Sequence, residues 1–421
     1  MTGTVHNPLH GKIIRRIVPY LMLIYMVAFL DRVNISFAAL TMNRDLGISE
    51  TIYGFAAGVF FLSYCLFQVP ANILLSRLGA RRWLGTLMVL WGIDVMATAF
   101  VNAAPSYISA RLLLGIAESG FYPGIIFYFT FWMPPSARTR ILALFLLSLP
   151  LCNAIGSPIS AHILLLNGWH GMHGWQWLFL MEGAPAIVLG IATWYILTDT
   201  PQTARWLTAG EKAQLARDIQ SEQPKTPTSS GRTITAVIRD AAVYFLWSSG
   251  NYGLIFFLPK ILTARGASTL AAGWWATLTF GVGALAMYFA SRTRGFRILP
   301  LLIALAALGF AAVALVPSLP VTLIGFCTAA IGLMASVPIF WSLAASRLSG
   351  KAAGTAIAIV NSVGAVGAFF GPQVMGWLHD KTHTYIAGIW VIAACVLLGA
   401  ILVIADARAP RHTPIEGARN S

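Results

Sequence analysis

The sequence divides into twelve apolar runs, each of the length that an α-helix needs to cross a lipid bilayer. A hydrocarbon layer ~30 Å thick takes about 20 helical residues to span. A composition that is 57% hydrophobic and 10% charged, with a mean hydropathy of +0.74, is more apolar than a soluble core requires. We therefore predict an all-α integral membrane protein with spans at 17–40, 53–75, 83–101, 106–131, 140–165, 177–198, 238–263, 270–291, 298–316, 320–346, 352–378 and 384–405.

The positive charge of the chain follows the order of these spans. Of the 28 Lys and Arg residues, 22 lie at every second boundary, four lie in the alternate loops, and Arg32 and Arg111 lie inside spans. Because cytoplasmic loops of membrane proteins are enriched in Lys and Arg, both termini are predicted to be cytoplasmic. The net charge of +14 is then a consequence of topology and does not indicate a nucleic-acid partner.

The spans form two sets of six, separated by the one long polar connection. We predict an N-terminal half over 1–198, a cytoplasmic linker over 199–237, a C-terminal half over 238–405 and a cytoplasmic tail over 406–421. Within the linker, Thr208 and Glu211 have the spacing of a capping box, which predicts a short helix. The basic turn at 76–82 has a counterpart at 291–297, and repeated halves with Gly/Pro-broken helices are typical of secondary transporters.

An acid and a guanidinium stand side by side in the first span, at Asp31 and Arg32. Asp31 lies about 21 Å into a helix that begins near 17, where a charged side chain costs at least ~2.5–3.5 kcal/mol. Such charges usually face a polar cavity and mark an ion or substrate path. The alternative is a neighbouring pair that merely neutralises itself. Asn34 completes the motif without a role that its sequence position defines.

A second charge cluster lies in the span over 106–131, where Arg111 and Glu118 are seven residues apart and share a helical face. A substrate that neutralises the arginine would change how readily the carboxylate takes a proton, which is the coupling that a proton symporter needs. The alternative is a helix-packing pair. For Asp94 and Glu182, a helix-end or interhelical hydrogen bond is the favoured interpretation.

The C-terminal half has polar and aromatic residues in midspan rather than charges, at Asn251, Tyr252, Trp341 and Asn361. This asymmetry predicts that the first half couples protons while the second shapes a pocket by stacking and hydrogen bonding. The cysteines and histidines have no metal-ligand spacing, so we expect no metal and no cofactor, and no catalytic constellation indicates an enzyme. No removable signal peptide is predicted.

Four motifs resemble those of the major facilitator superfamily and, within it, the anion:cation symporter family. They are Asp31-Arg32-Val-Asn34, the segment from Gln68 to Trp83, the segment from Arg111 to Gly124, and the segment from Gly174 to Pro185. The resemblance covers nearly the whole chain and is strongest to bacterial permeases for tartrate, phthalate, nicotinate and hydroxyphenylacetate. It implies proton-coupled uptake of a small organic anion by alternating access, in a monomer of the bacterial inner membrane.

The resemblance also implies roles for individual residues. Asp31 and Glu118 become candidate proton carriers, and Arg32 and Arg111 become candidates for contact with a substrate carboxylate. Further substrate contacts are expected at Tyr64, Asn251, Tyr252, Trp341 and Asn361, and gating contacts at Arg77, Arg81 and Arg292. The family usually has Asp at the positions of Ser76 and Ser291, so the acidic partner of the gating arginines is missing from the motif.

Two other functions stay open at the level of sequence. The same fold carries anion exchangers and uniporters, and an integral-membrane sensor can bind an anion without moving it. The identity of the carboxylate does not follow from the motifs, because hydroxy acids, aromatic acids and sugar acids would all use a guanidinium.

Overall fold

The computed structural model describes residues 8–134, 137, 141, 145, 148–221, 234–293, 295–346 and 351–408, and the regular structure within these ranges is helical. The Pro/Thr/Ser-rich part of the predicted linker, the beginning of the predicted 140–165 span and most of the predicted tail lie outside the described residues. The first half contains α1 (Pro8–Asp45), α2 (Glu50–Leu78), α3 (Ala80–Thr98), α4 (Ala104–Glu118), α5 (Phe121–Trp132), α7 (Ser148–Ile163) and α8 (Gly174–Ile196).

The second half contains α10 (Ile234–Ala264), α11 (Thr269–Ala290), α12 (Leu299–Leu315), α13 (Leu319–Ser346), α14 (Lys351–Thr382) and α15 (Ile386–Arg408). The short helix α9 (Ala209–Ser221) lies between the halves in sequence. Single 3-10 turns occur at Leu164–Leu166, Trp169–Gly171, Pro201–Thr203 and Phe296–Ile298.

Eleven helical segments in the described ranges are long and apolar enough to cross a membrane, with α4 and α5 counted together as Ala104–Trp132. Helix α3 has 19 residues but carries Arg81, Arg82 and Asp94, and it packs along α8 and α4 within the bundle. With α3 the number of spans is twelve, and the predicted fold class is confirmed.

The predicted span over 106–131 is broken in the structure. Helix α4 ends at Glu118 and α5 begins at Phe121, because Pro123 has no N–H to donate to Ser119 and its ring crowds the carbonyl one turn earlier. Gly120 lies at the break, where a Cβ atom would come within 2.7 Å of the Trp83 indole nitrogen. Glu118 therefore stands at the end of a helix rather than in the middle of one.

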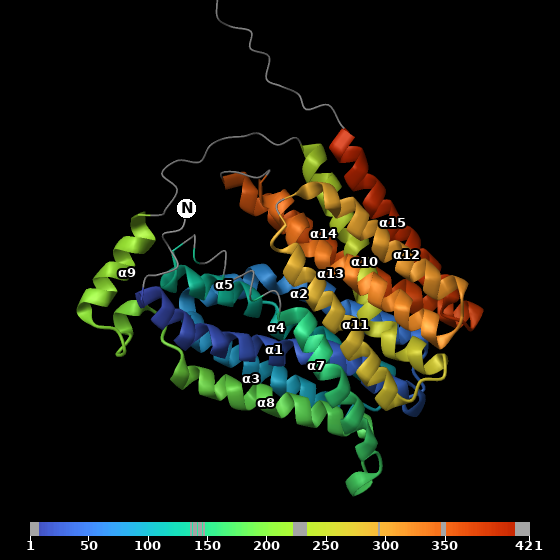
Figure 1. The fold of residues 1–421 in the computed structure, drawn as a ribbon. Coiled ribbons are helices and arrows are strands. Elements are labelled where there is room, and N and C mark those ends of the chain that lie inside the picture. The colour runs from blue at the N-terminus through green and yellow to red at the C-terminus, as the bar shows by residue number, and fades with distance from the viewer. Residues whose placement is uncertain are drawn as a thin grey trace, which may run out of the picture.

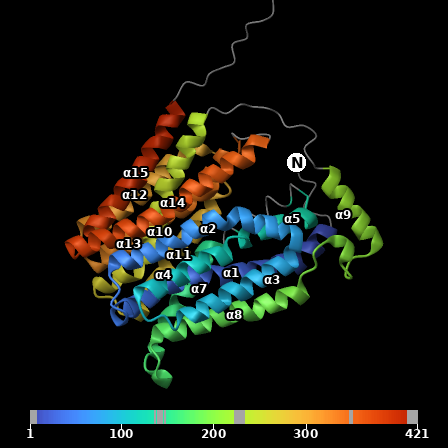
Figure 2. The ribbon, with the colours of Figure 1, turned by 180° about the vertical axis from the view of Figure 1, so that it is seen from behind.

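The two sets of helices form two bundles that meet along a shared interface. In Figure 1 the blue-to-green helices α1–α8 lie beside the yellow-to-red helices α10–α15, and Figure 2 shows the same division from behind. The bundles touch mainly through α2 against α14, α7 against α11 and α1 against α10.

Helix α9 docks on the N-terminal end of α1. Lys12 donates to Glu211 at 2.8 Å, and His10 lies 3.1 Å from Asp218. The Thr208 hydroxyl accepts from the backbone N–H of Glu211 at 3.2 Å, and the Glu211 carboxylate accepts from the backbone N–H of Thr208 at 2.8 Å. These contacts mark the end of the molecule at which α1 begins and α2 ends.

Candidate functional site

A cavity of about 780 Å³ lies between the two bundles. Helices α1, α2, α5 and α7 supply one wall, together with Glu118 of α4, and α10, α13 and α14 supply the other. The lining extends to Ser76 and Thr130, near the ends of α2 and α5, and to Ile357 near the beginning of α14. These three positions lie at the α9 end of the molecule, so the cavity reaches toward that end.

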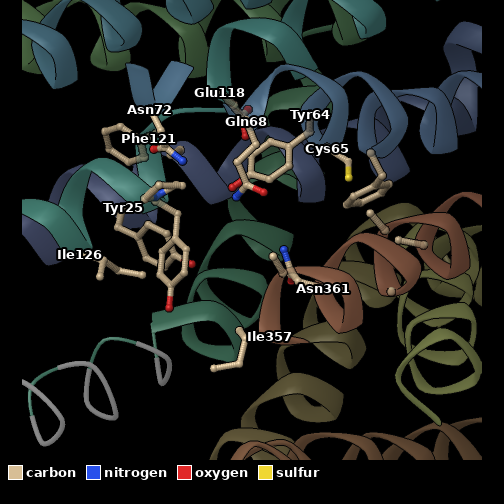
Figure 3. Close-up of a pocket in the computed structure, with 18 of the residues that line it drawn as sticks. Tyr25, Tyr64, Cys65, Gln68, Asn72, Glu118, Phe121, Ile126, Ile357 and Asn361 are labelled. Carbon is tan, nitrogen blue, oxygen red and sulfur yellow. The ribbon is translucent and has the colours of Figure 1, made fainter. Parts of the chain in front are cut away.

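An ion pair between α1 and α4 of the first half lies in the wall of this cavity. The Arg32 guanidinium of α1 donates to the Glu118 carboxylate of α4 at 3.3 Å, and both side chains are buried. Residues Glu118, Gln68 and Tyr64 appear together on one side of the cavity in Figure 3. The sequence placed Glu118 on one face with Arg111, but the arginine that it contacts comes from a different helix.

Aromatic rings surround the Arg32 guanidinium. Its central carbon lies 4.1 Å from the ring centre of Phe29, 5.7 Å from that of Phe61 and 5.9 Å from that of Tyr64. These distances allow cation–π attraction, which compensates part of the hydration that a buried guanidinium loses. The arginine is therefore held in position while its Nε atom has no hydrogen-bond partner.

The facing wall combines rings with amide and hydroxyl groups. Trp341 packs edge-on against Tyr244 with ring centres 5.0 Å apart, and Tyr252 contacts Phe61 of the first half at 4.3 Å. Asn361 points toward the cavity from α14, opposite Tyr64 (Figure 3). The cavity thus offers one paired guanidinium, several neutral hydrogen-bonding groups and extended aromatic surface.

The structure brings six of the nine predicted proton and substrate residues to the cavity lining: Arg32, Tyr64, Glu118, Tyr252, Trp341 and Asn361. Asp31, Arg111 and Asn251 are buried outside the described lining. Arg111 lies 5.1 Å from the Phe60 ring, and its Nε and Nη2 atoms have no hydrogen-bond partner. Asp31 accepts a hydrogen bond from the Asn34 amide at 3.4 Å.

The three predicted gating arginines lie at the α9 end or in the equivalent turn of the second half. Arg77 and Arg292 are exposed, and Arg292 stacks on Tyr288 with 4.2 Å to the ring centre. Arg81 forms an ion pair of 3.4 Å with Asp199, which also accepts the Arg81 backbone N–H at 2.9 Å. Asp199, which follows α8, thus supplies the carboxylate that the motif lacks at Ser76.

Sequence reasoning missed several lining residues, including Tyr25, Gln68, Asn72 and Tyr244. Gln68 and Asn72 are spaced by four residues in an otherwise apolar span, so they share one helical face, and this pattern was the available signal. The tyrosines gave no comparable signal, because an aromatic residue in an apolar helix is usually a packing residue.

At the opposite end the two bundles are joined by polar contacts. Lys260 of α10 donates to Glu50 of α2 at 2.5 Å, and Asp380 of α14 accepts the backbone N–H of Thr51 at 2.8 Å. The Tyr53 hydroxyl donates to the Phe256 carbonyl at 2.9 Å. The cavity is therefore closed at this end, and no sequence motif predicted the contacts that close it.

Two six-helix bundles around a central cavity that is closed at one end define a membrane transporter. A family model described as Major Facilitator Superfamily matches residues 21–372, and the chain belongs to this family.

Individual relatives agree with this assignment. The chain is 42% identical to a candidate tartrate transporter of Agrobacterium vitis, over 96% of this chain and 94% of the relative. It is 37% identical to the candidate metabolite transport protein NicT of Pseudomonas putida, over 94% of each. The predicted similarity to the tartrate and nicotinate branch is confirmed. A bacterial homologue of the human lysosomal transporter Spinster, solved in an inward-facing conformation, shares the fold with a TM-score of 0.73 at 18% identity, over 95% of this chain and 98% of that structure.

Proposed function

We propose that this protein is a monomeric secondary transporter that carries a small organic anion into a bacterial cell together with H⁺. The proposal places it in the inner membrane with both termini in the cytoplasm, as the distribution of Lys and Arg favours. With this orientation the cavity reaches toward the cytoplasm, and the Glu50–Lys260 end is the outer end. The conformation described here is then the inward-facing state of an alternating-access cycle.

The observation that carries the proposal is the Arg32–Glu118 pair in the cavity wall. A guanidinium binds a planar carboxylate through two parallel hydrogen bonds, so a substrate carboxylate competes with Glu118 for Arg32. Once Arg32 has turned to the substrate, Glu118 has lost the partner that favoured its charged form and takes up a proton. Anion and proton then cross together, and the loss of either restores the pair.

The remaining predicted residues enter the proposal around this exchange. Asp31 is a second candidate proton site behind Arg32. Arg111, which lies outside the described lining with its guanidinium 5.1 Å from the Phe60 ring centre, is proposed to contact the anion in another state of the cycle. Asn251 is proposed as a further substrate contact; in this structure it is buried outside the described lining.

The gating arginines are proposed to act at the cytoplasmic end. Arg81 already pairs with Asp199, and Arg77 and Arg292 project from equivalent turns of the two halves. When the cytoplasmic end closes, these turns approach the opposite bundle, and the arginines would form the contacts that hold the closed end.

The experiment is uptake by proteoliposomes under an inward proton gradient, with labelled carboxylates as candidate substrates. The relative from Agrobacterium makes hydroxy dicarboxylates the first set to test, and the aromatic lining makes aromatic and nicotinate-like carboxylates the second. We expect accumulation that a protonophore abolishes, and we expect Glu118→Gln to abolish accumulation while retaining counterflow. Uptake that does not respond to the protonophore would contradict symport: equilibration without accumulation would indicate uniport, and uptake that requires an anion inside the liposomes would indicate exchange.

A further inference from the structure

A second cavity, the end pocket, lies at the end of the molecule where polar contacts join the two bundles. It has a volume of about 680 Å³ and is lined by the end of α1, the turn into α2, the end of α10 and Tyr385 before α15. Among the described residues it shares no part of its lining with the central cavity. Arg44, Gly47, Ser49 and Ala264 in its wall are exposed, so the pocket opens to the surface.

A buried ammonium group lies in the wall of the end pocket. Lys260 is 6% exposed, and its Nζ atom donates to Oε1 of Glu50 and lies 4.7 Å from the ring centre of Tyr53. An ammonium group has three N–H donors. In the described part of the chain one of them binds a carboxylate and another can face the ring, which leaves a third for an acceptor that enters the pocket.

The carboxylate that holds this lysine is incompletely satisfied. Oε1 of Glu50 accepts from both Lys260 and the Asn43 amide, the second at 3.4 Å, while Oε2 is buried and has no hydrogen-bond partner among the described residues. Because an unsatisfied buried acceptor is costly, exchange of Glu50 for another carboxylate at Lys260 gives up less than the loss of a fully satisfied pair. Glu50 also lines the pocket, so its side chain can turn toward water there.

The charges of the lining favour an anion. Arg44 and Lys260 are cationic, and Glu50 is the one acid among the described lining residues. The Arg44 side chain is 84% exposed at the rim, and its nearest acid, Asp45, is 3.9 Å away and accepts a hydrogen bond from the Trp175 indole. The pocket therefore carries a net positive charge, which raises the local concentration of anions.

We propose that the end pocket binds a small carboxylate anion, which takes the Lys260 ammonium from Glu50. Lys260 belongs to α10 and Glu50 to α2, so the exchange removes an ion pair that joins the two bundles. A ligand shifts a conformational equilibrium by its difference in affinity for the two states. An anion that binds Lys260 best after Glu50 has left favours the molecule that is open at this end. This link to alternating access rests on the proposed function, whereas binding in the pocket does not.

The first test measures the protection of a thiol in the end pocket. Ala264→Cys places a thiol in the lining of the full-length protein, with the four native cysteines changed to serine and the protein held in nanodiscs. The probes are L-tartrate and benzoate, and chloride at equal ionic strength is the control. Since only the empty pocket reacts, a carboxylate at about ten times its dissociation constant should slow alkylation roughly tenfold. Equal slowing by chloride, or no slowing by either carboxylate, would overturn the proposal.

Two variants that break the same ion pair should have opposite effects on this protection. Lys260→Gln removes the cation that binds the anion, so half-maximal protection should need roughly tenfold more carboxylate or more. Glu50→Gln removes the competing carboxylate, so half-maximal protection should need roughly tenfold less. A purely structural role of the pair would move both values in the same direction, and that result would contradict the proposal.

Two further results keep this comparison decisive. If Lys260→Gln fails to fold, Glu50→Gln is sufficient by itself, because unchanged or weaker protection in that variant would count against competition for Lys260. Arg32→Gln is the control for the central cavity and should leave the protection of Ala264→Cys unchanged. Loss of protection in Arg32→Gln would assign the effect to the central cavity instead.

The second test measures whether an anion in the end pocket opens this end. In Arg32→Gln protein that retains Cys65 as its single cysteine, the carboxylate should slow alkylation of Cys65 from the α9 side, and Lys260→Gln should remove this effect. An unchanged Cys65 rate would refute the opening. If wild-type protein shows no proton-driven uptake, the proposed function fails, and the protection of Ala264→Cys still decides whether the end pocket binds an anion.

Discussion

The carboxylate of Asp380, near the end of α14, accepts a hydrogen bond of 2.8 Å from the backbone N–H of Thr51 in the first turn of α2. It also accepts the N–H of Glu50 at 3.2 Å, while Lys260 pairs with the Glu50 side chain. A helix N-terminus has unpaired N–H groups and a partial positive charge, so a carboxylate stabilises it. The second half thus caps a helix of the first half, and this contact must break when the closed end opens.

Removal of this cap should favour the conformation in which the Glu50–Lys260 end is open. For Asp380→Ala we expect the loss of charge-assisted hydrogen bonds worth about 1.5–3 kcal/mol, which lowers the ratio of molecules closed at the Glu50–Lys260 end to molecules open there by roughly 10- to 150-fold. Cys65 lines the cavity and reports this ratio through its rate of alkylation from the α9 side, in a protein whose other cysteines are serine. The exposed neighbour Lys381→Ala is the control, and equal rates in the two variants would contradict the role of the cap.

Close helix packing at the same end makes a second prediction. A Cβ atom at Gly54 would lie 2.3 Å from the Pro372 carbonyl oxygen, so Gly54→Ala must separate α2 from α14. Overpacking of this kind costs about 1–3 kcal/mol, and the maximal uptake rate and Cys65 alkylation should both fall. Gly281→Ala is the matched control, because nothing lies within 4 Å of its new methyl group and the gain in helix propensity is the same. Wild-type behaviour of Gly54→Ala would show that the closed end tolerates separation.

The geometry of Arg32 predicts that a positive charge alone at this position is not enough for tight binding of the anion. Arg32→Lys keeps a cation but loses the planar fork, so the dissociation constant of the transported anion should rise about 10- to 100-fold. Quenching of Trp341 fluorescence in the cavity measures this dissociation constant, and the Trp341→Phe variant identifies which part of the signal comes from Trp341. Arg111→Lys should change binding less in the conformation described here, because Arg111 lies outside the described cavity lining. Equal effects of the two lysine variants would count against Arg32 as the direct contact.

The docking of α9 should depend on pH in the acidic range. The hydrogen bond from Lys12, followed by the one from the Thr208 backbone, lowers the pKa of Glu211. A lowered pKa means that the contact is fully present above the ordinary Glu value near 4.3 and is lost as pH falls through the lower value in the docked state. Hydrogen exchange of α9 should therefore stay constant from about pH 8 to 5 after correction for intrinsic rates, and rise below about pH 4.

Glu211→Gln isolates this contribution from that of the neighbouring His10–Asp218 contact. The variant should show faster exchange at neutral pH and a smaller rise in acid. Trp206, which stacks on Trp132 with ring centres 5.4 Å apart, provides a second signal for the same segment. An acid response of Glu211→Gln identical to that of wild type would assign the pH dependence to other groups.

The number and position of the spans could be predicted because lipid imposes a local rule. In hydrocarbon every backbone N–H and C=O must be satisfied within the segment, so each span is a run of apolar residues of helical length. Asp31, Arg32, Arg111 and Glu118 stood out for the same reason, since charge in such a run is costly wherever the helix packs. The helix break after Glu118 was harder to predict, because Pro123 was its one signal in the sequence.

The pairing of these charges could not be predicted, because it depends on contacts between helices that are distant in sequence. Spacing placed Arg111 and Glu118 on one face, yet in the structure Glu118 pairs with Arg32 of α1, and Arg111 lies near the Phe60 ring outside the described lining. The same holds for Asp199 at Arg81 and for Asp380 at Thr51. The sequence by itself determined a twelve-helix membrane protein with charges in its first half. The tertiary structure decided which of those charges face a cavity and which end of it is closed, because ion pairs and hydrogen bonds form only where helix packing brings side chains within about 3 Å of each other.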